Sequence, residues 1–207
     1  NPVSAVAGGW KEVGRTTLGG AVSTITVSSI TDKRYYMILN SSLGTVANAD
    51  IYGQFNSDTG SNYSNRFAYN GTEGTQVSQA RNSVHIAAAA SNTPFFAVGN
   101  YANLSAKEKL GICNSVQQYT AGAGTAPQRS ENATKWANTA AVINAYTLMN
   151  SGASNYAIGS EVVVLGWDPA DTHTTNFWEE LASGAGTGVN NITSGTFTAK
   201  KYLWVQI

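Results

Sequence analysis

Short stretches in which hydrophobic and polar residues alternate make up most of the chain. Between positions 51 and 55, Ile51, Gly53 and Phe55 alternate with Tyr52 and Gln54. A period of two is typical of a half-buried β-strand, because successive side chains point to opposite faces of a sheet. The predicted strands span residues 10–18, 23–27, 34–39, 50–55, 63–69, 83–88, 95–102, 110–118, 134–136 with its flanks, 141–149 and 160–167.

Turn-forming residues separate these stretches about every ten positions, and helical periodicity is almost absent. Asn70-Gly71 is the strongest hairpin signal in the chain, since these two residue types tolerate the positive φ of a type I′ turn. A turn of helix is attractive on propensity only at residues 87–90 and 138–144. The pattern therefore predicts an all-β protein, an antiparallel sandwich or a barrel, with short helical turns in its connections.

The end of the chain repeats features of its beginning. WEEL at residues 178–181 matches WKEV at 10–13, and KKYLWV at 200–205 matches KRYYMI at 33–38, at a spacing of 167 to 168 residues. The alternative is a C-terminal hairpin that merely resembles the N-terminal one. A repeat of this size sets the domain organisation, which we predict as an N-terminal arm (1–9), a β-sandwich domain (10–176) and a C-terminal β segment that opens a second unit (177–207).

The last residues of this C-terminal segment have the pattern of a strand. Leu203, Val205 and Ile207 alternate with Tyr202 and Trp204. A two-stranded piece of this size cannot bury its apolar side chains alone. We therefore expect the segment to lie on the edge of its own domain, to complete a neighbouring subunit, or to belong to a longer chain.

Composition narrows the classes of partner. Charged residues make up 12% of the chain, and 12 basic residues balance 12 acidic ones. A neutral chain has no long-range field that would attract nucleic acid or an anionic membrane, so we expect no nucleic-acid partner. We also find no apolar run of membrane-spanning length and expect no membrane insertion.

Nothing in the sequence forms a recognisable catalytic constellation. Cys113 is the only cysteine and lies in an apolar run, which favours a small buried side chain over a nucleophile. His85 lies within a predicted strand, and we interpret it as a sheet residue. Asp168, Asp171 and His173 lie together in a Pro-containing segment that is typical of an exposed loop. We therefore predict a non-enzymatic protein without catalytic residues.

Asn56, Asp58 and Asn62 place oxygen-bearing side chains around Gly60. This spacing is compatible with a calcium ion, although Gly60 comes one place too early for an EF-hand loop and no acidic residue closes the loop. A turn stabilised by its own side chains explains the same residues, and we favour it. No other cofactor is predicted.

Three motifs carry a resemblance. WKEVGRTTL at 10–18, KRY at 33–35 and FNSDTGSNY at 55–63 resemble a loosely defined group of phage and environmental-virus structural proteins. The likeness is best over the first 70 residues. It implies a jelly-roll-like β-sandwich and a non-enzymatic role in capsid decoration, a tail or a fibre.

We therefore expect a structural subunit of a virion or similar extracellular assembly, whose partners are copies of itself and other particle proteins. Terminal segments would cross between subunits, because an added strand supplies main-chain hydrogen bonds to a receptive sheet edge. The candidate assembly residues are Pro2, Val3, Val6, Trp178, Leu181, Tyr202, Leu203, Trp204, Val205 and Ile207.

Two alternatives remain open. A cellular surface filament subunit would use the same assembly physics. A carbohydrate-binding or adhesin module would take surface glycans as its partner and would expose several coplanar aromatic rings together. The aromatic residues whose exposure distinguishes such a module from a structural subunit are Tyr52, Tyr63, Trp136, Trp167 and Trp178.

Overall fold

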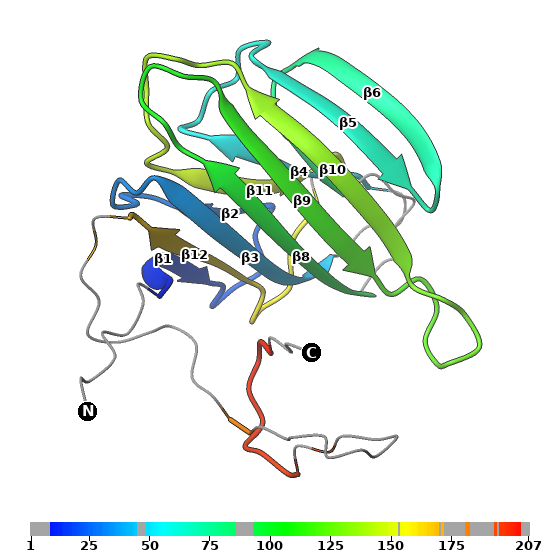
Figure 1. The fold of residues 1–207 in the computed structure, drawn as a ribbon. Coiled ribbons are helices and arrows are strands. Elements are labelled where there is room, and N and C mark those ends of the chain that lie inside the picture. The colour runs from blue at the N-terminus through cyan, green and yellow to red at the C-terminus, as the bar shows by residue number, and fades with distance from the viewer. Residues whose placement is uncertain are drawn as a thin grey trace, which may run out of the picture.

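The computed structural model describes residues 9–44, 49–85, 93–152, 154–169, 171, 181–182, 193 and 195–203. This part of the chain contains twelve strands and no helix (Figure 1). The strands are β1 Lys11–Thr17, β2 Thr24–Val27, β3 Tyr35–Gly44, β4 Ile51–Phe55, β5 Tyr63–Tyr69, β6 Thr72–Gln79, β7 Asn82–His85, β8 Thr93–Ala102, β9 Lys109–Gln117, β10 Gln128–Trp136, β11 Tyr146–Asn150 and β12 Glu161–Trp167.

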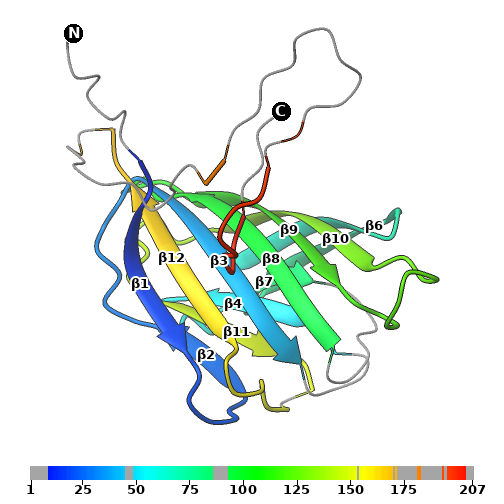
Figure 2. The same cartoon turned by 90° about the horizontal axis from the view of Figure 1, so that it is seen from below.

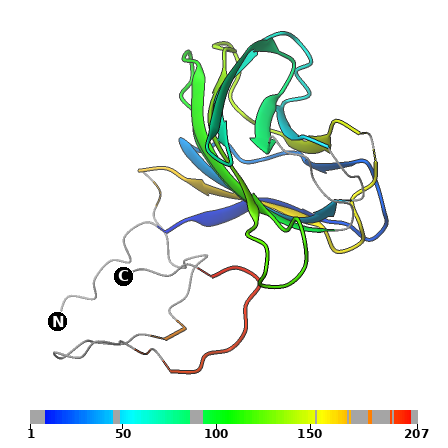
Figure 3. The same cartoon turned by 90° about the vertical axis from the view of Figure 1, so that its right-hand side faces the viewer.

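The strands form two sheets that pack face to face. The larger sheet has eight strands in the order β1-β12-β3-β8-β9-β10-β5-β6, and the smaller has four in the order β2-β11-β4-β7. Neighbouring strands in both sheets run antiparallel. Viewed from the side, the two layers enclose a common interior (Figure 3). The predicted all-β, antiparallel sandwich is thereby confirmed.

The core fills the space between the sheets. It combines aliphatic side chains such as Ile25 and Leu148 with a cluster of aromatic rings, in which Tyr63 stacks on Trp136 at a centroid distance of 6.2 Å. The Phe55 ring lies 5.6 Å from Trp136 and meets Tyr101 edge to face. Cys113 is a free, buried core residue, as its apolar setting predicts.

The Asn70-Gly71 turn has the geometry that its sequence predicts. Asn70 has φ 46° and Gly71 φ 89°, and they connect β5 to β6 with Tyr69 opposite Thr72. Positive φ at both central positions is the signature of a type I′ turn, whose twist matches that of the strands.

The prediction of a helical turn at residues 138–144 is wrong. Their backbone amides are bound by side chains instead: Asn56 Oδ1 accepts from the N–H of Asn144 and Ala145, and Asn103 Oδ1 accepts from Ile143. The segment has no regular secondary structure, and the strand predicted from residue 141 begins only at Tyr146. Residues 87–90 lie outside the described part of the chain.

Candidate interaction site on the large sheet

The face of the eight-stranded sheet that points away from the small sheet, called here the outer face, carries its own apolar cluster. Leu39, Val163 and Leu165 are buried there, with Trp10 and Tyr202 packed against them. β12 has a nearly continuous apolar sequence, EVVVLGW, because Val162 and Val164 face the core while Val163 and Leu165 face outward. Strands buried on both faces have such uninterrupted apolar runs.

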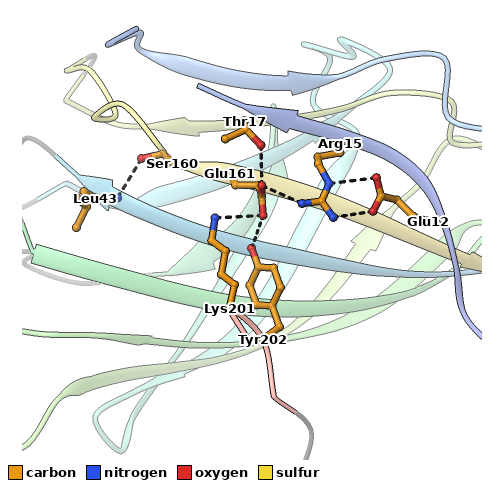
Figure 4. A network of polar contacts seen from close by, with 8 residues as sticks. All are labelled: Glu12, Arg15, Thr17, Leu43, Ser160, Glu161, Lys201 and Tyr202. Atoms are coloured by element: carbon orange, nitrogen blue, oxygen red, sulfur yellow. Dashed lines mark hydrogen bonds and ion pairs between the residues drawn. The ribbon is translucent and has the colours of Figure 1, made fainter. Parts of the chain in front are cut away.

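The C-terminal residues are anchored to this face at Glu161, the first residue of β12 (Figure 4). The Tyr202 hydroxyl donates to Glu161 Oε1 at 3.1 Å, and Lys201 Nζ lies 3.2 Å from the same oxygen. In Figure 2 the described C-terminal residues, coloured red, lie over β3 and β8. Two consecutive side chains therefore fix the end of the described chain to the sheet.

The second carboxylate oxygen of Glu161 is held by strand β1. Thr17 Oγ1 donates to Glu161 Oε2 at 2.6 Å, and Arg15 Nη1 does so at 3.0 Å. Arg15 is in turn bound by both carboxylate oxygens of Glu12, at 2.7 and 3.1 Å. Strand β1 thus binds one carboxylate oxygen of Glu161, and the C-terminal segment binds the other.

These contacts keep Glu161 ionised although its side chain is only 5% exposed. Burial by itself would raise its pKa, but the hydrogen bonds from Thr17, Lys201 and Tyr202, together with the charge of Arg15, lower it below its ordinary value. The same burial and the nearby carboxylate raise the pKa of the Tyr202 hydroxyl. The site is therefore a buried carboxylate that binds two hydroxyl groups, of Thr17 and Tyr202, and two cations, Arg15 and Lys201.

A hollow of about 460 Å³ adjoins this anchor. The ring of Tyr202 lies 6.0 Å from that of Phe96, which is 37% exposed, and Val116 continues the apolar surface. The loop after β9 contributes Thr120 and Thr125 to the lining of the hollow.

A second hollow, of about 480 Å³, lies elsewhere on the outer face. Its walls include Trp10, the stacked pair of Tyr35 and Trp167 at 5.2 Å, and the exposed side chains of Leu110 and Ile112 on β9. The outer face therefore offers apolar surface at both hollows.

The candidate assembly residues divide into a described and an undescribed group. Tyr202 is half-buried at the Glu161 anchor, Leu203 beside it is 53% exposed, and Leu181 is half-buried. The remaining candidates, Pro2, Val3, Val6, Trp178, Trp204, Val205 and Ile207, lie outside the described residues.

The strand predicted at residues 202–207 lies mostly outside the described residues, which include only Tyr202 and Leu203 of it. Residues 200–203 are not in a strand. Tyr202 lays its ring against Phe96 and its hydroxyl against Glu161, so the segment meets the flat side of the sheet through side chains. Pairing by main-chain hydrogen bonds would require an edge strand instead.

Asn56, Asp58 and Asn62 use their polar atoms within the protein. The Asp58 carboxylate accepts from Asn62 Nδ2 at 2.9 Å, from the Gly60 amide at 2.9 Å and from Trp136 Nε1 at 2.7 Å. Asn56 binds the segment 142–145, as described above. The geometry is that of a turn stabilised by its own side chains, and the described residues contain no group of three or more His, Cys, Asp or Glu placed for a metal.

The five aromatic residues that distinguish a glycan platform are not exposed together. Tyr52, Tyr63 and Trp136 are buried, Trp167 is half-buried in its stack with Tyr35, and Trp178 lies outside the described residues. Tyr52 is covered by Arg81, whose guanidinium lies 4.0 Å from the ring centroid.

His85 is a buried sheet residue, as its sequence indicates. Its Nδ1 lies 2.7 Å from Ser115 Oγ, and burial lowers its pKa to about 4. Asp171 forms an ion pair with Lys33, while His173 lies outside the described residues.

No helix in the described part of the chain is long and apolar enough to cross a membrane.

Sequence reasoning missed Glu161, Arg15, Thr17 and Phe96. A signal for Glu161 exists: it lies two positions before Val163, so it shares the outward face of an apolar strand, where an acid needs a partner. The partners themselves come from distant segments, and no local pattern connects them.

Comparisons with protein-family models, with curated proteins and with solved structures give no match to this chain.

Proposed function

We propose that the protein is a non-enzymatic structural subunit of a virion or similar extracellular assembly, whose copies associate through the outer face of the large sheet. The observation that carries this proposal is the anchoring of Lys201 and Tyr202 at the buried carboxylate of Glu161. A terminal segment held on an apolar sheet face by a few side chains is the kind of contact that can also join neighbouring subunits.

The order of the strands supports a jelly-roll arrangement. If the hairpin β5-β6 and the pair β9-β10 are left aside, the sheets reduce to β1-β12-β3-β8 and β2-β11-β4-β7. Numbered afresh, these eight strands read 1-8-3-6 and 2-7-4-5, so the first is beside the last, the second beside the seventh, and so on inward. That nesting is expected of an antiparallel ribbon rolled into a double sheet, an architecture found in viral capsid and lectin domains.

The remaining surface supports a structural role as well. Large apolar side chains stay exposed on the outer face at Leu110 and Ile112, 58% and 60% respectively. Together with the stacked Tyr35 and Trp167 they form apolar surface of the kind that interaction sites use. Low charge leaves little electrostatic repulsion between copies.

Native and denatured masses of the purified full chain test the proposal. We expect a native mass that is a multiple of the denatured mass, and closed or filamentous particles in electron micrographs. A chain that stays monomeric at all concentrations would contradict the proposal.

A carbohydrate-binding or adhesin module on such a particle is the second candidate. The second hollow favours it, because it combines the rings of Trp10, Tyr35 and Trp167 with the amide of Asn100. Aromatic walls with a few polar groups are a common form of ligand site. Titration with a panel of soluble oligosaccharides, followed by tryptophan fluorescence, tests it: saturable binding that Trp167→Ala abolishes would favour the module.

A cellular surface filament would form by the same contacts as a virion component, and the source of the particle distinguishes the two.

A further inference from the structure

Residues that follow β12 contact the sandwich at both ends of that strand. β12 begins at Glu161 and ends at Trp167, and the exit is fixed by the ion pair between Lys33 and Asp171. Lys201 and Tyr202 contact the sheet at Glu161. Seven residues of strand correspond to about 20 Å between exit and anchor.

The connection between these points is much longer than that distance requires. Residues 172–200 comprise 29 positions, whose fully extended length is about 95 Å. A connection of this length can bring Tyr202 to the Glu161 of its own chain or to that of a neighbouring copy. The contacts made would be identical, so the choice depends on the proximity and concentration of the neighbour.

The receptor half of the contact is complete without the C-terminal segment. Thr17 and Arg15 hold Glu161 Oε2, and Glu12 holds Arg15, all from β1 and β12. Glu161 Oε1 is left to Lys201 and Tyr202. The site therefore presents a fixed, negatively charged acceptor in an apolar surround, which complements a segment carrying a cation next to an aromatic hydroxyl.

Apolar surface continues on both partners around this contact. Leu203, the residue after the anchor, is 53% exposed, and on the sheet side Phe96 and Val116 are 37% and 43% exposed. The docked segment thus leaves apolar area on itself and on the sheet that a second copy can cover.

We infer that in the assembly the segment 195–203 of one copy binds the outer face of a second copy, with Lys201 and Tyr202 of the first copy on Glu161 of the second. This inference rests on the proposed function. Exchange of an identical element between subunits needs no new contact, since the bonds made between copies replace those made within one.

A pair of complementary variants of the full chain tests the exchange. Lys201→Ala/Tyr202→Ala removes the donor and keeps the receptor, while Glu161→Ala removes the receptor and keeps the donor. Glu161→Gln serves as a second receptor variant if Glu161→Ala does not fold by circular dichroism. Lys107→Ala/Val77→Ala is the control, because it removes an exposed lysine and an exposed apolar side chain that do not line the hollow at the anchor.

We expect the wild type and the control to assemble and each anchor variant alone to lose assembly. An equimolar mixture of the donor and receptor variants should recover heterodimers, because each pair can form one intact contact, and native mass spectrometry should find one chain of each kind in the complex. If the wild type assembles and the mixture does no better than the separate variants, the segment does not cross between copies and the inference is wrong, although the proposed function stands. A monomeric wild type would overturn both.

Discussion

Trp136 and Asp58 connect the core to the turn at residues 56–62. The indole Nε1 of Trp136, a residue buried between the sheets, donates to Asp58 Oδ2 at 2.7 Å. Burial by itself would raise the pKa of Asp58, but the hydrogen bonds from Trp136, Asn62 and Gly60 outweigh it and lower the pKa. The turn therefore fixes the position of the largest core side chain.

Replacing Asp58 by alanine should destabilise the protein. The buried indole N–H would lose its acceptor, and an unsatisfied buried donor costs about 1–3 kcal/mol. Urea denaturation of Asp58→Ala measures the loss, and Thr59→Ala, an exposed neighbour in the same turn, is the control. If calcium raised the melting temperature of the wild type and not of Asp58→Ala, the turn would be a cation site.

Gly111 on β9 should not tolerate a side chain. A Cβ there would lie 2.2 Å from the ring of Tyr101, a buried core residue with little room to move. Overpacking of this kind costs about 1–3 kcal/mol. Gly124→Ala, where nothing lies within 4 Å, is the matched control and should leave the free energy of unfolding nearly unchanged. Equal effects of the two substitutions would contradict the packing around Tyr101.

His85 should make stability depend on pH on the acid side of neutrality. Burial lowers its pKa in the folded protein to about 4, whereas an unfolded histidine has a pKa of about 6.5. The unfolded chain therefore binds the proton first, and this contribution to stability is complete above pH 6.5 and is lost as the pH falls towards 4. Its full size is about 3 kcal/mol, from 1.36 kcal/mol for each pKa unit. Urea titrations of the wild type and His85→Gln between pH 7 and 4 measure it, and parallel curves for the two proteins would show that His85 is not the group responsible.

Docking of the C-terminal segment should weaken in acid. The hydrogen bonds from Lys201 and Tyr202 help to lower the pKa of Glu161, so docking favours the ionised carboxylate and is lost as the pH falls through the lowered pKa. A fluorophore on Leu203→Cys reports docking through its anisotropy, because Leu203 is exposed and Cys113 is buried and unreactive. We expect the anisotropy to fall in acid for the wild-type anchor and to be lower and independent of pH in Glu161→Gln.

The fold class could be predicted from the sequence because the signals for it are local. Short β-like runs between turn-forming residues marked β8 and β12 closely, and Asn70-Gly71 identified its own turn. β6 has a polar sequence, TEGTQVSQ, and no periodicity of its own. Its position follows from that turn alone.

The anchor could not be predicted in the same way. Glu161 and Tyr202 are 41 positions apart, and their contact depends on the burial of both at the outer face. The prediction of a helical turn at residues 138–144 was wrong for a related reason. Asn56 and Asn103, from distant loops, accept hydrogen bonds from backbone amides near the end of this segment. In each case a long-range side chain decided the structure against the local preference.

The pairing of β1 with β12 has a consequence for how the sandwich can be built into other chains. Lys11 lies opposite Gly166, so the polypeptide enters and leaves the domain on adjacent strands, about 5 Å apart. A domain with neighbouring entry and exit points can be inserted into a loop of a host protein without forcing that loop open. The same closeness permits a short peptide bridge between the start of β1 and the end of β12. New termini could then be placed in the exposed, glycine-containing loop between β9 and β10. The result would be a circularly permuted sandwich that keeps every strand pair.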